Sequence, residues 1–395
     1  MTIQSLLTQH KIENRFIHWL PQRERWLFDR LSSYPVHPCN ILLVNATKGH
    51  SYYASIIDFV RNLNRLHPKV RFISCSHFDD IAEFHKEVRQ KGIPTLPIKA
   101  LQNIASHKLN RFDAIIFVGP SMTMIDIMQR KDISSKLIMI DLAFYHQLIE
   151  ATPLFVQGKP FVPQARHLQH IHCYTTQTPP KLRQDLQNAG FQMGASHWTL
   201  YPFPYIPLNF SYATYYQSTS QLFDVVFLGA KNRNYSSIPK KSLTNKKLLF
   251  IGDQKYIKED FKELIQDLDI TISPKLNEDD YRKMLSLCRC AVLPFFDFTL
   301  NSFCSIQDTF AMGIPTITNP HLGITEAYKT GAPLHLFHQE QKFDFIETTN
   351  FTQALEDALQ NRTDIAHQQF ALRYAQEQLD IYRMLDRIFC EQIFI

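Results

Sequence analysis

The chain has 395 residues, which is more than one compact core usually supports, so we expect two domains of ordinary size. Hydrophobic residues make up 45% of the chain, enough to bury both cores. Lys and Arg outnumber Asp and Glu by 42 to 37, a mild excess that excludes a dedicated nucleic-acid binder but suits an anionic ligand or membrane surface.

The seven cysteines are scattered, mostly within apolar runs, which favours free thiols in a reducing compartment. Cys288 and Cys290 are separated by one residue, a spacing that fits neither a zinc knuckle nor a redox pair, so no metal is expected. The N-terminus lacks an apolar signal region, and no apolar run approaches the ~20 residues that span a bilayer. We therefore expect a cytoplasmic protein that contacts the inner membrane at most peripherally.

Residues 1–38 predict a helical preface. Several arginines alternate there with large apolar side chains, namely Phe16, Trp19, Trp26, Phe28 and Leu31. A basic aromatic helix of this kind either lies on a membrane interface or packs on its own domain, and the sequence leaves both open.

Residues 39–205 predict a Rossmann-like domain that holds the acceptor. An apolar run of buried-strand type is followed by a polar loop and a helical stretch, and the same design recurs along the segment. The strand-like runs are 41–44, 70–73, 114–118 and 137–140. Strands that alternate with helices predict βαβ units and a parallel sheet, because parallel strands need long crossovers.

A cluster of prolines then interrupts the pattern. Pro202, Pro204 and Pro207 stand too close together for a helix or a sheet centre, and residues 206–222 are interpreted as a linker. The pattern restarts at 224–229, with later strands at 248–252, 270–272, 291–293 and 316–317. Residues 223–365 therefore predict a second Rossmann-like domain, and 366–395 a single amphipathic helix.

The most informative stretch is 291–326. It indicates a buried strand, a polar loop and a helix that ends at Gly313. In an open α/β sheet, ligands bind at the carboxyl ends of strands, where helix N-termini present free N–H groups to anions. We therefore predict that the loop and the helix start bind a nucleotide, through Asn301, Ser302 and Phe303.

This stretch resembles the GT4 group of glycosyltransferases, whose hallmark ends in Glu-Ala-Met-x-x-Gly-x-Pro. The counterpart here is Asp308-Thr-Phe-Ala-Met-Gly313-Ile-Pro315, and the resemblance covers residues 224–330. It implies an α/β fold of GT-B architecture, with two Rossmann-like domains facing across a cleft. By resemblance, Asp308 takes the place of the glutamate that accepts hydrogen bonds from the nucleotide ribose, so ligand hydroxyls rather than protein groups are its expected partners.

The sequence departs from the family at the first glutamate of the motif. In strict register that position is Leu300, but a two-residue insertion in the loop would bring Asp297 or Phe298 into its place. The glycine-rich turn has become Leu300-Asn-Ser-Phe303. Either the sugar site is reshaped, with Asp297 as its acid, or catalysis has been lost.

A second signal follows the strand at 224–229. In the family, an Arg and a Lys placed after this strand hold the diphosphate and neutralise the charge that develops on the leaving group. Lys231 and Arg233 are the matching residues here, and Gly229 is assigned to nucleotide binding beside them. The alternative is a solvated basic loop.

The N-terminal half carries one further catalytic prediction. Asp141 follows the strand-like run at 137–140, where the family often carries a His-Asp pair. It would orient an acceptor hydroxyl or act as its base, but an Asp just past a strand is also an ordinary helix N-cap.

The sequence therefore predicts transfer of a glycosyl unit from a nucleotide diphosphate sugar to a glycan, lipid-linked or other acceptor. No cofactor, metal or nucleic-acid partner is expected, because the helix dipole and basic side chains replace a metal in this fold class. The resemblance implies a retaining hexosyltransferase of bacterial surface polysaccharide synthesis. Two alternatives stay open: a sugar-nucleotide epimerase on the same architecture, and a non-catalytic nucleotide-sugar-binding module.

Overall fold

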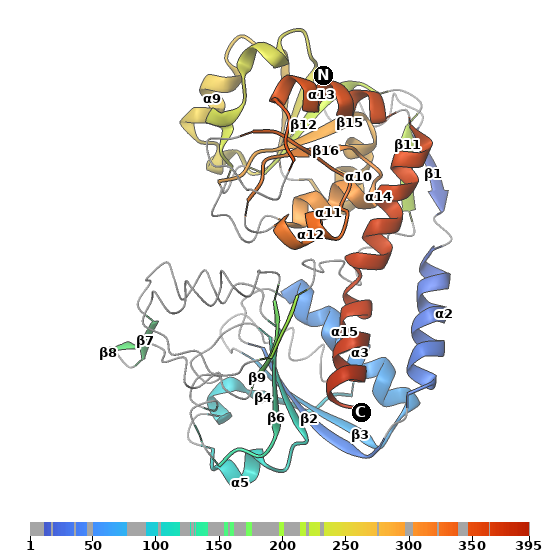
Figure 1. The fold of residues 1–395 in the computed structure, drawn as a ribbon, viewed down its shortest axis with the longest axis vertical. Coiled ribbons are helices and arrows are strands. Elements are labelled where there is room, and N and C mark those ends of the chain that lie inside the picture. The colour runs from blue at the N-terminus through green and yellow to red at the C-terminus, as the bar shows by residue number, and fades with distance from the viewer. Residues whose placement is uncertain are drawn as a thin grey trace. The chain divides into compact units, whose positions relative to one another are not determined.

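The structure, a computed structural model, divides into two units with separate sheets (Figure 1). The N-terminal unit comprises Gln22–Phe210 and Ile381–Ile395, and the C-terminal unit comprises Met1–Pro21 and Ser211–Asp380. The residues that the structure describes are 12–16, 19–34, 37–45, 50–76, 92–101, 104–118, 127, 130, 132–140, 154–156, 159–161, 171–175, 197–200, 214–218, 221–229, 233–274, 276–296, 303–321, 324–338, 347–362 and 364–394.

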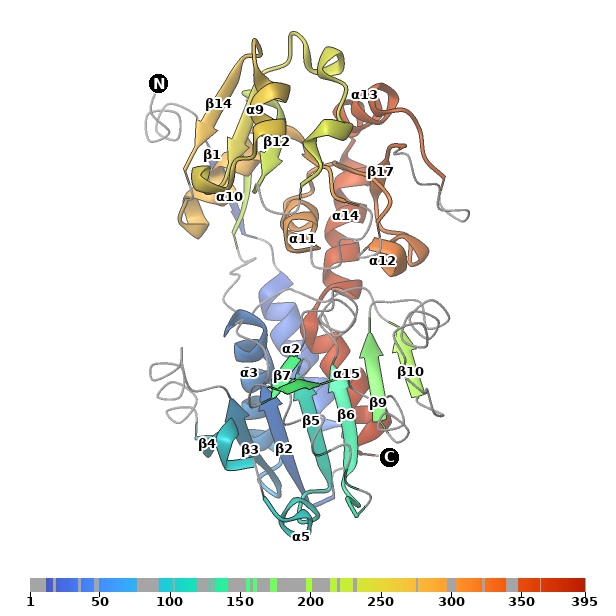
Figure 2. The same cartoon turned by 90° about the vertical axis from the view of Figure 1, so that its left-hand side faces the viewer.

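The N-terminal unit is built on a seven-stranded sheet in the order β10-β9-β6-β5-β2-β3-β4 (Figure 2). All six neighbouring pairs are parallel. The strands are β2 (Cys39–Asn45), β3 (Val70–Ser76), β4 (Thr95–Pro97), β5 (Ala114–Val118), β6 (Lys136–Ile140), β9 (Ile171–Thr175) and β10 (His197–Leu200). Because the first strand, β2, lies between β3 and β5, the sheet is doubly wound. The predicted parallel α/β fold is confirmed.

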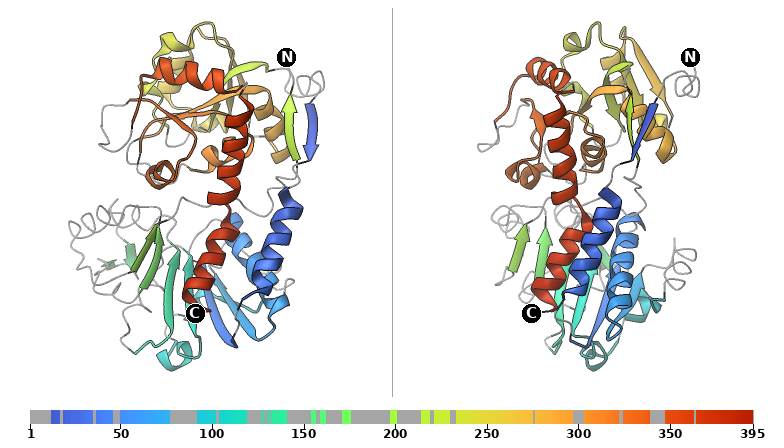
Figure 3. Two further views of the ribbon diagram at one scale, coloured as in Figure 1. Left: turned by 45° about the vertical axis from the view of Figure 1, so that its right-hand side comes forward. Right: turned by 90° about the vertical axis from the view of Figure 1, so that its right-hand side faces the viewer.

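Three helices cover one face of this sheet: α2 (Trp19–Ser32), α3 (His50–Leu66) and α15 (Ile381–Gln392). Figure 3 shows α15 lying beside α2. In the core that they share, the ring of Phe59 from α3 lies 5.9 Å from that of Tyr382 and 5.3 Å from that of Phe389. The last helix of the chain thus completes the core of the N-terminal unit.

The expected helical preface is only partly helical. Strand β1 (Ile12–Phe16) precedes α2 and pairs antiparallel with β11 (Thr214–Ser218). Helix α2 packs on its own unit, because Leu27 and Leu31 are buried and the guanidinium of Arg383 stacks 4.4 Å from the ring of Trp26. Of the two open interpretations of this helix, the contacts support packing.

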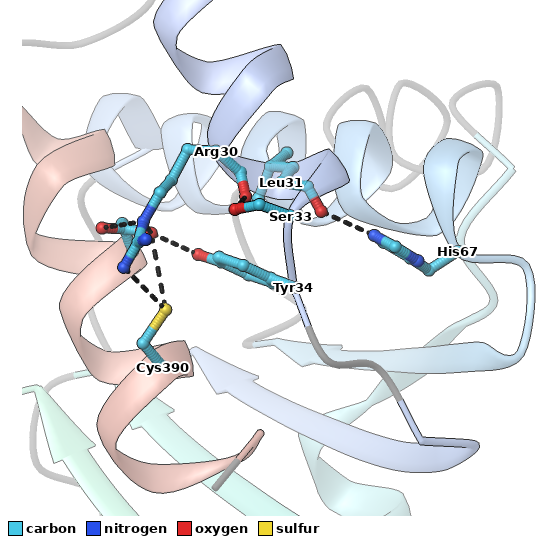
Figure 4. A network of polar contacts seen from close by, with 7 residues as sticks. Arg30, Leu31, Ser33, Tyr34, His67 and Cys390 are labelled. Atoms are coloured by element: carbon cyan, nitrogen blue, oxygen red, sulfur yellow. Dashed lines mark hydrogen bonds and ion pairs between the residues drawn. The ribbon is translucent and has the colours of Figure 1, made fainter.

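A polar network fixes α15 to α2 (Figure 4). The carboxylate of Asp386 accepts hydrogen bonds from the hydroxyl of Tyr34 at 2.6 Å and from Nε of Arg30 at 2.8 Å. Burial, together with the hydrogen bond to Asp386, raises the pKa of Tyr34 far above its usual range, so the hydroxyl stays a donor. A ring nitrogen of His67 also hydrogen-bonds the carbonyl of Leu31 at 2.6 Å.

The C-terminal unit repeats this topology. Its six-stranded sheet has the order β14-β13-β12-β15-β16-β17, and all its strand pairs are parallel. The strands are β12 (Phe223–Leu228), β13 (Leu248–Ile251), β14 (Ile270–Ser273), β15 (Cys288–Leu293), β16 (Thr316–Thr318) and β17 (Leu334–Leu336). The first strand again lies inside the sheet, between β13 and β15, so the predicted restart of the α/β pattern is confirmed.

The helices of this unit are α9 (Glu259–Ile265), α10 (Glu278–Ser286), α11 (Phe303–Ala311), α12 (Thr325–Lys329), α13 (Phe351–Asn361) and α14 (Ile365–Gln378). Side chains of Asn277 and Asn350 cap the starts of α10 and α13 by accepting backbone N–H bonds. Gly313 follows α11 with φ 60°, and so forms the predicted end of this helix. A Cβ at this position would lie only 3.4 Å from the side chain of Gln368 on α14.

The prediction of a single terminal helix at 366–395 is wrong. The segment forms two helices, α14 in the C-terminal unit and α15 in the N-terminal unit, with Leu379 and Asp380 between them. Neither glycine nor proline marks the break, and the helical spacing of apolar residues continues across it in the sequence. The sequence therefore carries no local sign that the helix ends there.

Five described cysteines, namely Cys39, Cys75, Cys288, Cys290 and Cys390, are free thiols. Burial raises the pKa of Cys39 to about 11 and that of Cys75 to about 12, so neither is a reactive thiolate at neutral pH. Within the described ranges, no helix has the length and apolarity to cross a bilayer, and no group of three or more His, Cys, Asp or Glu residues is arranged to hold a metal.

Two histidines stack inside the C-terminal unit. The rings of His335 on β17 and His367 on α14 lie 5.6 Å apart. Burial, and then the neighbouring His367, lower the pKa of His335 to about 4, against an opposing contribution from Asp357. Burial also lowers the pKa of His367, opposed by Asp364. Both rings are therefore neutral in the folded protein near pH 7.

This pair predicts acid sensitivity of the C-terminal unit. Between the unfolded pKa near 6.5 and the folded pKa of about 4, the unfolded chain binds more protons at His335, so stability falls as the pH is lowered. At pH 5 the loss from this group is up to about 2 kcal/mol. Urea titrations of the wild type at pH 7 and 5 should show this loss, and His335→Gln should reduce it. An equal loss in both proteins would contradict the prediction.

Candidate functional site

The candidate site lies at the carboxyl ends of β12 and β15. In the strand order of the C-terminal sheet, chain connections diverge between these two neighbours, which makes this edge its topological switch point. The loop after β12 begins at Gly229 and the loop after β15 begins at Pro294. Ligands of doubly wound sheets bind in the crevice that such loops form.

Arg233 joins the two loops. Its guanidinium donates to the carbonyl of Leu228 through Nε at 3.1 Å and through Nη2 at 2.9 Å, and Nη2 also donates to the hydroxyl of Ser305 on α11 at 3.0 Å. The group stacks 4.0 Å from the ring centre of Phe295, and the residue is 5% exposed. Arg233 thus fixes the end of β12 to the start of α11.

The loop after β12 is held by close backbone packing. Gly229 has φ 68°, a left-handed conformation that favours glycine, and its carbonyl accepts from the hydroxyl of Tyr235 at 2.6 Å. Its neighbour just after β13, Gly252, is tightly packed, because a Cβ there would lie 3.1 Å from the Cα of Gly229 and would require the backbone to shift. The left-handed backbone of Gly229 is therefore held by contacts with Tyr235 and Gly252.

A buried amide fixes the other side of the crevice. Asn319, which follows β16, is fully buried, accepts from the N–H of Phe295 at 2.7 Å and donates to its carbonyl at 2.9 Å. These bonds reproduce a strand pairing just beyond β15. The ring of His321 packs 4.7 Å from that of Phe295. Phe295 is thus held between Asn319 and Arg233.

Helix α11 starts at this edge with Phe303, so its free N–H groups and the positive end of its dipole lie at the crevice. Asp308 projects from its second turn and accepts from the hydroxyl of Tyr281 on α10 at 3.0 Å. The expectation that ligand hydroxyls alone would be its partners is therefore wrong. A carboxylate has about four acceptor positions, so the bond from Tyr281 does not by itself exclude a ribose.

The structure describes four of the nine predicted site residues. Gly229 and Arg233 lie close together after β12. Phe303, of which only the backbone is described, and Asp308 both belong to α11. The other five predicted residues lie outside the described residues: Asp141, Lys231, Asp297, Asn301 and Ser302.

The sequence analysis missed the residues that support this site. Phe295, Asn319 and Tyr281 each contact a predicted residue or its loop. A weak signal was present for Asn319, because a polar residue directly after a strand at the carboxyl edge is well placed to join neighbouring loops. The stacking of Arg233 on Phe295 had no signal, since 62 positions separate the two residues (295 − 233).

Electrostatically, the crevice suits an anion. Arg233 brings a buried positive charge, and Nζ of Lys258 lies 5.1 Å from the ring centre of Phe296, directly after the site's phenylalanine. The N-terminus of α11 adds its dipole at the same edge. A phosphate group placed here would meet backbone N–H groups and the positive charge of Arg233.

Comparison with solved structures identifies the fold. A glycosyltransferase from Rickettsia africae aligns with a TM-score of 0.55 at 12% identity, over 89% of this chain and 97% of its own. The lipopolysaccharide outer core galactosyltransferase WaaB aligns with a TM-score of 0.55 at 10% identity, over 89% and 99%. Sucrose-phosphate synthase from Thermosynechococcus elongatus aligns with a TM-score of 0.52 at 11% identity, over 89% and 98%.

These structures share the GT-B fold, so the predicted fold class is confirmed over about 90% of the chain. No protein-family model matches the chain, and no curated protein matches it in sequence.

Proposed function

We propose that this protein is a glycosyltransferase that moves a sugar from a nucleotide diphosphate sugar to a glycan or lipid-linked acceptor. One observation carries the proposal: Gly229, Arg233 and the start of α11 meet at the switch point of the C-terminal sheet, where a diphosphate fits the charge and the geometry. The fold shared with three glycosyl-transferring proteins supports the reaction class.

Each described site residue has a role in this proposal. Asp308 accepts hydrogen bonds from the ribose, and the N-terminus of α11 binds the diphosphate. Arg233 holds the two loops in register and places a fixed positive charge where negative charge develops on the departing diphosphate. Because these charges are preorganised, they need little rearrangement as the glycosidic bond breaks.

The finer assignments rest on resemblance. The GT4-like motif supports hexosyl transfer with retention at the anomeric carbon, and the name of the WaaB galactosyltransferase supports a setting in bacterial surface polysaccharide assembly. The free, buried thiols support a reducing compartment, the cytoplasm. Lys231 is proposed as a second cation at the diphosphate, Asp297 as the acid of the sugar site, and Asp141 as the group that orients the acceptor hydroxyl.

Nucleoside diphosphate release tests the proposal against its alternatives. A panel of labelled nucleotide sugars is incubated with the purified chain, with and without a bacterial glycan and lipid extract. A transferase releases nucleoside diphosphate and moves label into the extract. A binding module releases none, and an epimerase changes the sugar without acceptor; either outcome would replace the proposed reaction.

Asp308→Ala is expected to weaken binding of the nucleoside diphosphate by about 10- to 150-fold, because charged hydrogen bonds to the ribose are worth roughly 1.5–3 kcal/mol. Titration calorimetry measures the loss. Tyr281→Phe separates ligand binding from packing, since it removes the hydroxyl that donates to Asp308 and keeps the carboxylate.

The matched control is Asp269→Ala, an exposed acid just before β14, at the opposite edge of the same sheet. Both Tyr281→Phe and Asp269→Ala should change nucleotide affinity by less than about threefold. Unchanged affinity in Asp308→Ala would remove Asp308 from the site.

A further inference from the structure

A cavity of about 650 Å³ opens in the N-terminal unit, and its position separates it from the switch point of that sheet. Its walls include Asn40 near the start of β2, Arg71 near the start of β3, and Phe112 just before β5. These are the amino ends of parallel strands. The seven residues of β2 put the carboxyl edge of the sheet about 20 Å away.

Three cationic side chains line the cavity. Arg71, Lys108 and Arg111 all border it, and none of the described residues that line it is acidic. Within the described part of the chain, these three side chains form no ion pair. The nearest acid along the chain is Asp113, whose carboxylate accepts a hydrogen bond from the backbone N–H of Asn40 at 2.7 Å.

The three side chains are exposed to solvent, and their like charges make the potential at the cavity favourable to a negative partner. Short elements fix the arrangement. Lys108 belongs to α5 (Ser106–Leu109) and Arg111 to the turn after it, where the N–H of Phe112 bonds the carbonyl of Leu109 at 2.9 Å. Arg71 is held by the pairing of β3 with β2.

Most of the remaining lining is apolar. Phe72, Ile93, Pro94 and Phe112 face a volume within the range of small-ligand pockets, roughly 300–1,000 Å³. Amide groups of Asn40 and Asn64 add hydrogen-bonding capacity beside the cations. A ligand that satisfies this lining has a negatively charged head and an apolar or aromatic body.

We infer that this cavity is a second ligand site, which binds a phosphate ester with an apolar or aromatic organic part. The phosphate contacts Arg71, Lys108 and Arg111, and the organic part packs on Pro94 and Phe112. Guanidinium groups suit this task because they bind phosphate oxygens in pairs. The same head group occurs on free metabolites and on anionic lipids. The site does not depend on the proposed sugar transfer at the C-terminal unit.

The test uses the full chain and phenyl phosphate as probe, by titration calorimetry at low ionic strength. Phenyl phosphate should bind more tightly than inorganic phosphate, and the affinity should fall as NaCl is added. The double variant Arg71→Ala/Arg111→Ala should lose about tenfold or more in affinity. The control Arg65→Ala removes an exposed arginine of α3 outside the cavity and should bind like the wild type.

Two further arms identify the source of the phosphate and guard against the other site. The first arm is co-sedimentation with phosphatidylglycerol vesicles. A lipid head group is assigned if the vesicles bind the wild type and Arg65→Ala but not the double variant, while phenyl phosphate does not bind. Binding of phenyl phosphate with no vesicle binding assigns a soluble ester. The inference is overturned if neither probe binds, if the double variant matches Arg65→Ala, or if Arg233→Ala in the C-terminal unit loses as much affinity for phenyl phosphate as the double variant does.

Discussion

Arg233→Ala is expected to lower kcat for sugar transfer by a factor on the order of 10²–10³, with a smaller change in nucleotide affinity. The reason is that charge builds on the diphosphate as the glycosidic bond breaks, so a fixed cation contributes more in the transition state than in the ground state. The variant also loses the bonds to Leu228 and Ser305, so circular dichroism must first confirm the fold. Steady-state transfer assays then measure kcat.

Two further variants make this result specific. Lys246→Ala removes a cation of the same basic segment, but Lys246 precedes β13 and therefore belongs to the opposite, amino edge of the sheet, so kcat should not change. Arg233→Lys keeps the positive charge and loses the fork that bonds Leu228, and it should retain more activity than the alanine variant. If Arg233→Ala and Lys246→Ala behave alike, the diphosphate is bound elsewhere.

Asn319→Leu is expected to lower the free energy of unfolding of the C-terminal unit by about 2–5 kcal/mol, since two buried backbone groups of Phe295 lose their partners. Leucine fills nearly the same volume, so the loss reports hydrogen bonding rather than a cavity. Phe295 supports Arg233, and nucleotide affinity should fall as well. Urea unfolding followed by circular dichroism measures the stability.

Asn361→Leu is the matched control for this substitution. Asn361 ends α13 and makes a single long contact, 3.4 Å, with the ring of His335. Its replacement should cost less than about 1 kcal/mol. Equal losses in the two variants would show that the bridge from Asn319 to Phe295 adds little to the C-terminal unit.

The sequence predicted the fold well because buried parallel strands leave a strong local pattern. The apolar run 114–118 coincides with β5, and 291–293 falls within β15. It did not predict the break between α14 and α15, because both helices are amphipathic and no glycine or proline separates them. Strand β1 was missed since its partner β11 lies about 200 residues away in the chain, and long-range pairing leaves no local signal.

The candidate site was predictable where motif and geometry agree. A glycine after the first strand of a Rossmann-like unit, and an acid inside the helix after β15, were assigned from position together with the family resemblance, as Gly229 and Asp308. The surroundings of these residues were not. Whether Asp308 bonds a ligand or Tyr281 depends on how α10 packs against its neighbour, and no spacing in one sequence encodes that packing.

Thermal denaturation in the presence of nucleotides tests the central claim most directly. The purified chain is melted with UDP, GDP, ADP and CMP, and with their sugar conjugates. A ligand at 100 times its Kd stabilises by about 2.7 kcal/mol, which raises Tm by several degrees. We predict such a rise for one nucleoside diphosphate and its sugar conjugate, and its reduction to about half or less in Asp308→Ala but not in Asp269→Ala. No rise with any nucleotide or nucleotide sugar would contradict a nucleotide-sugar site at the carboxyl edge of β12 and β15.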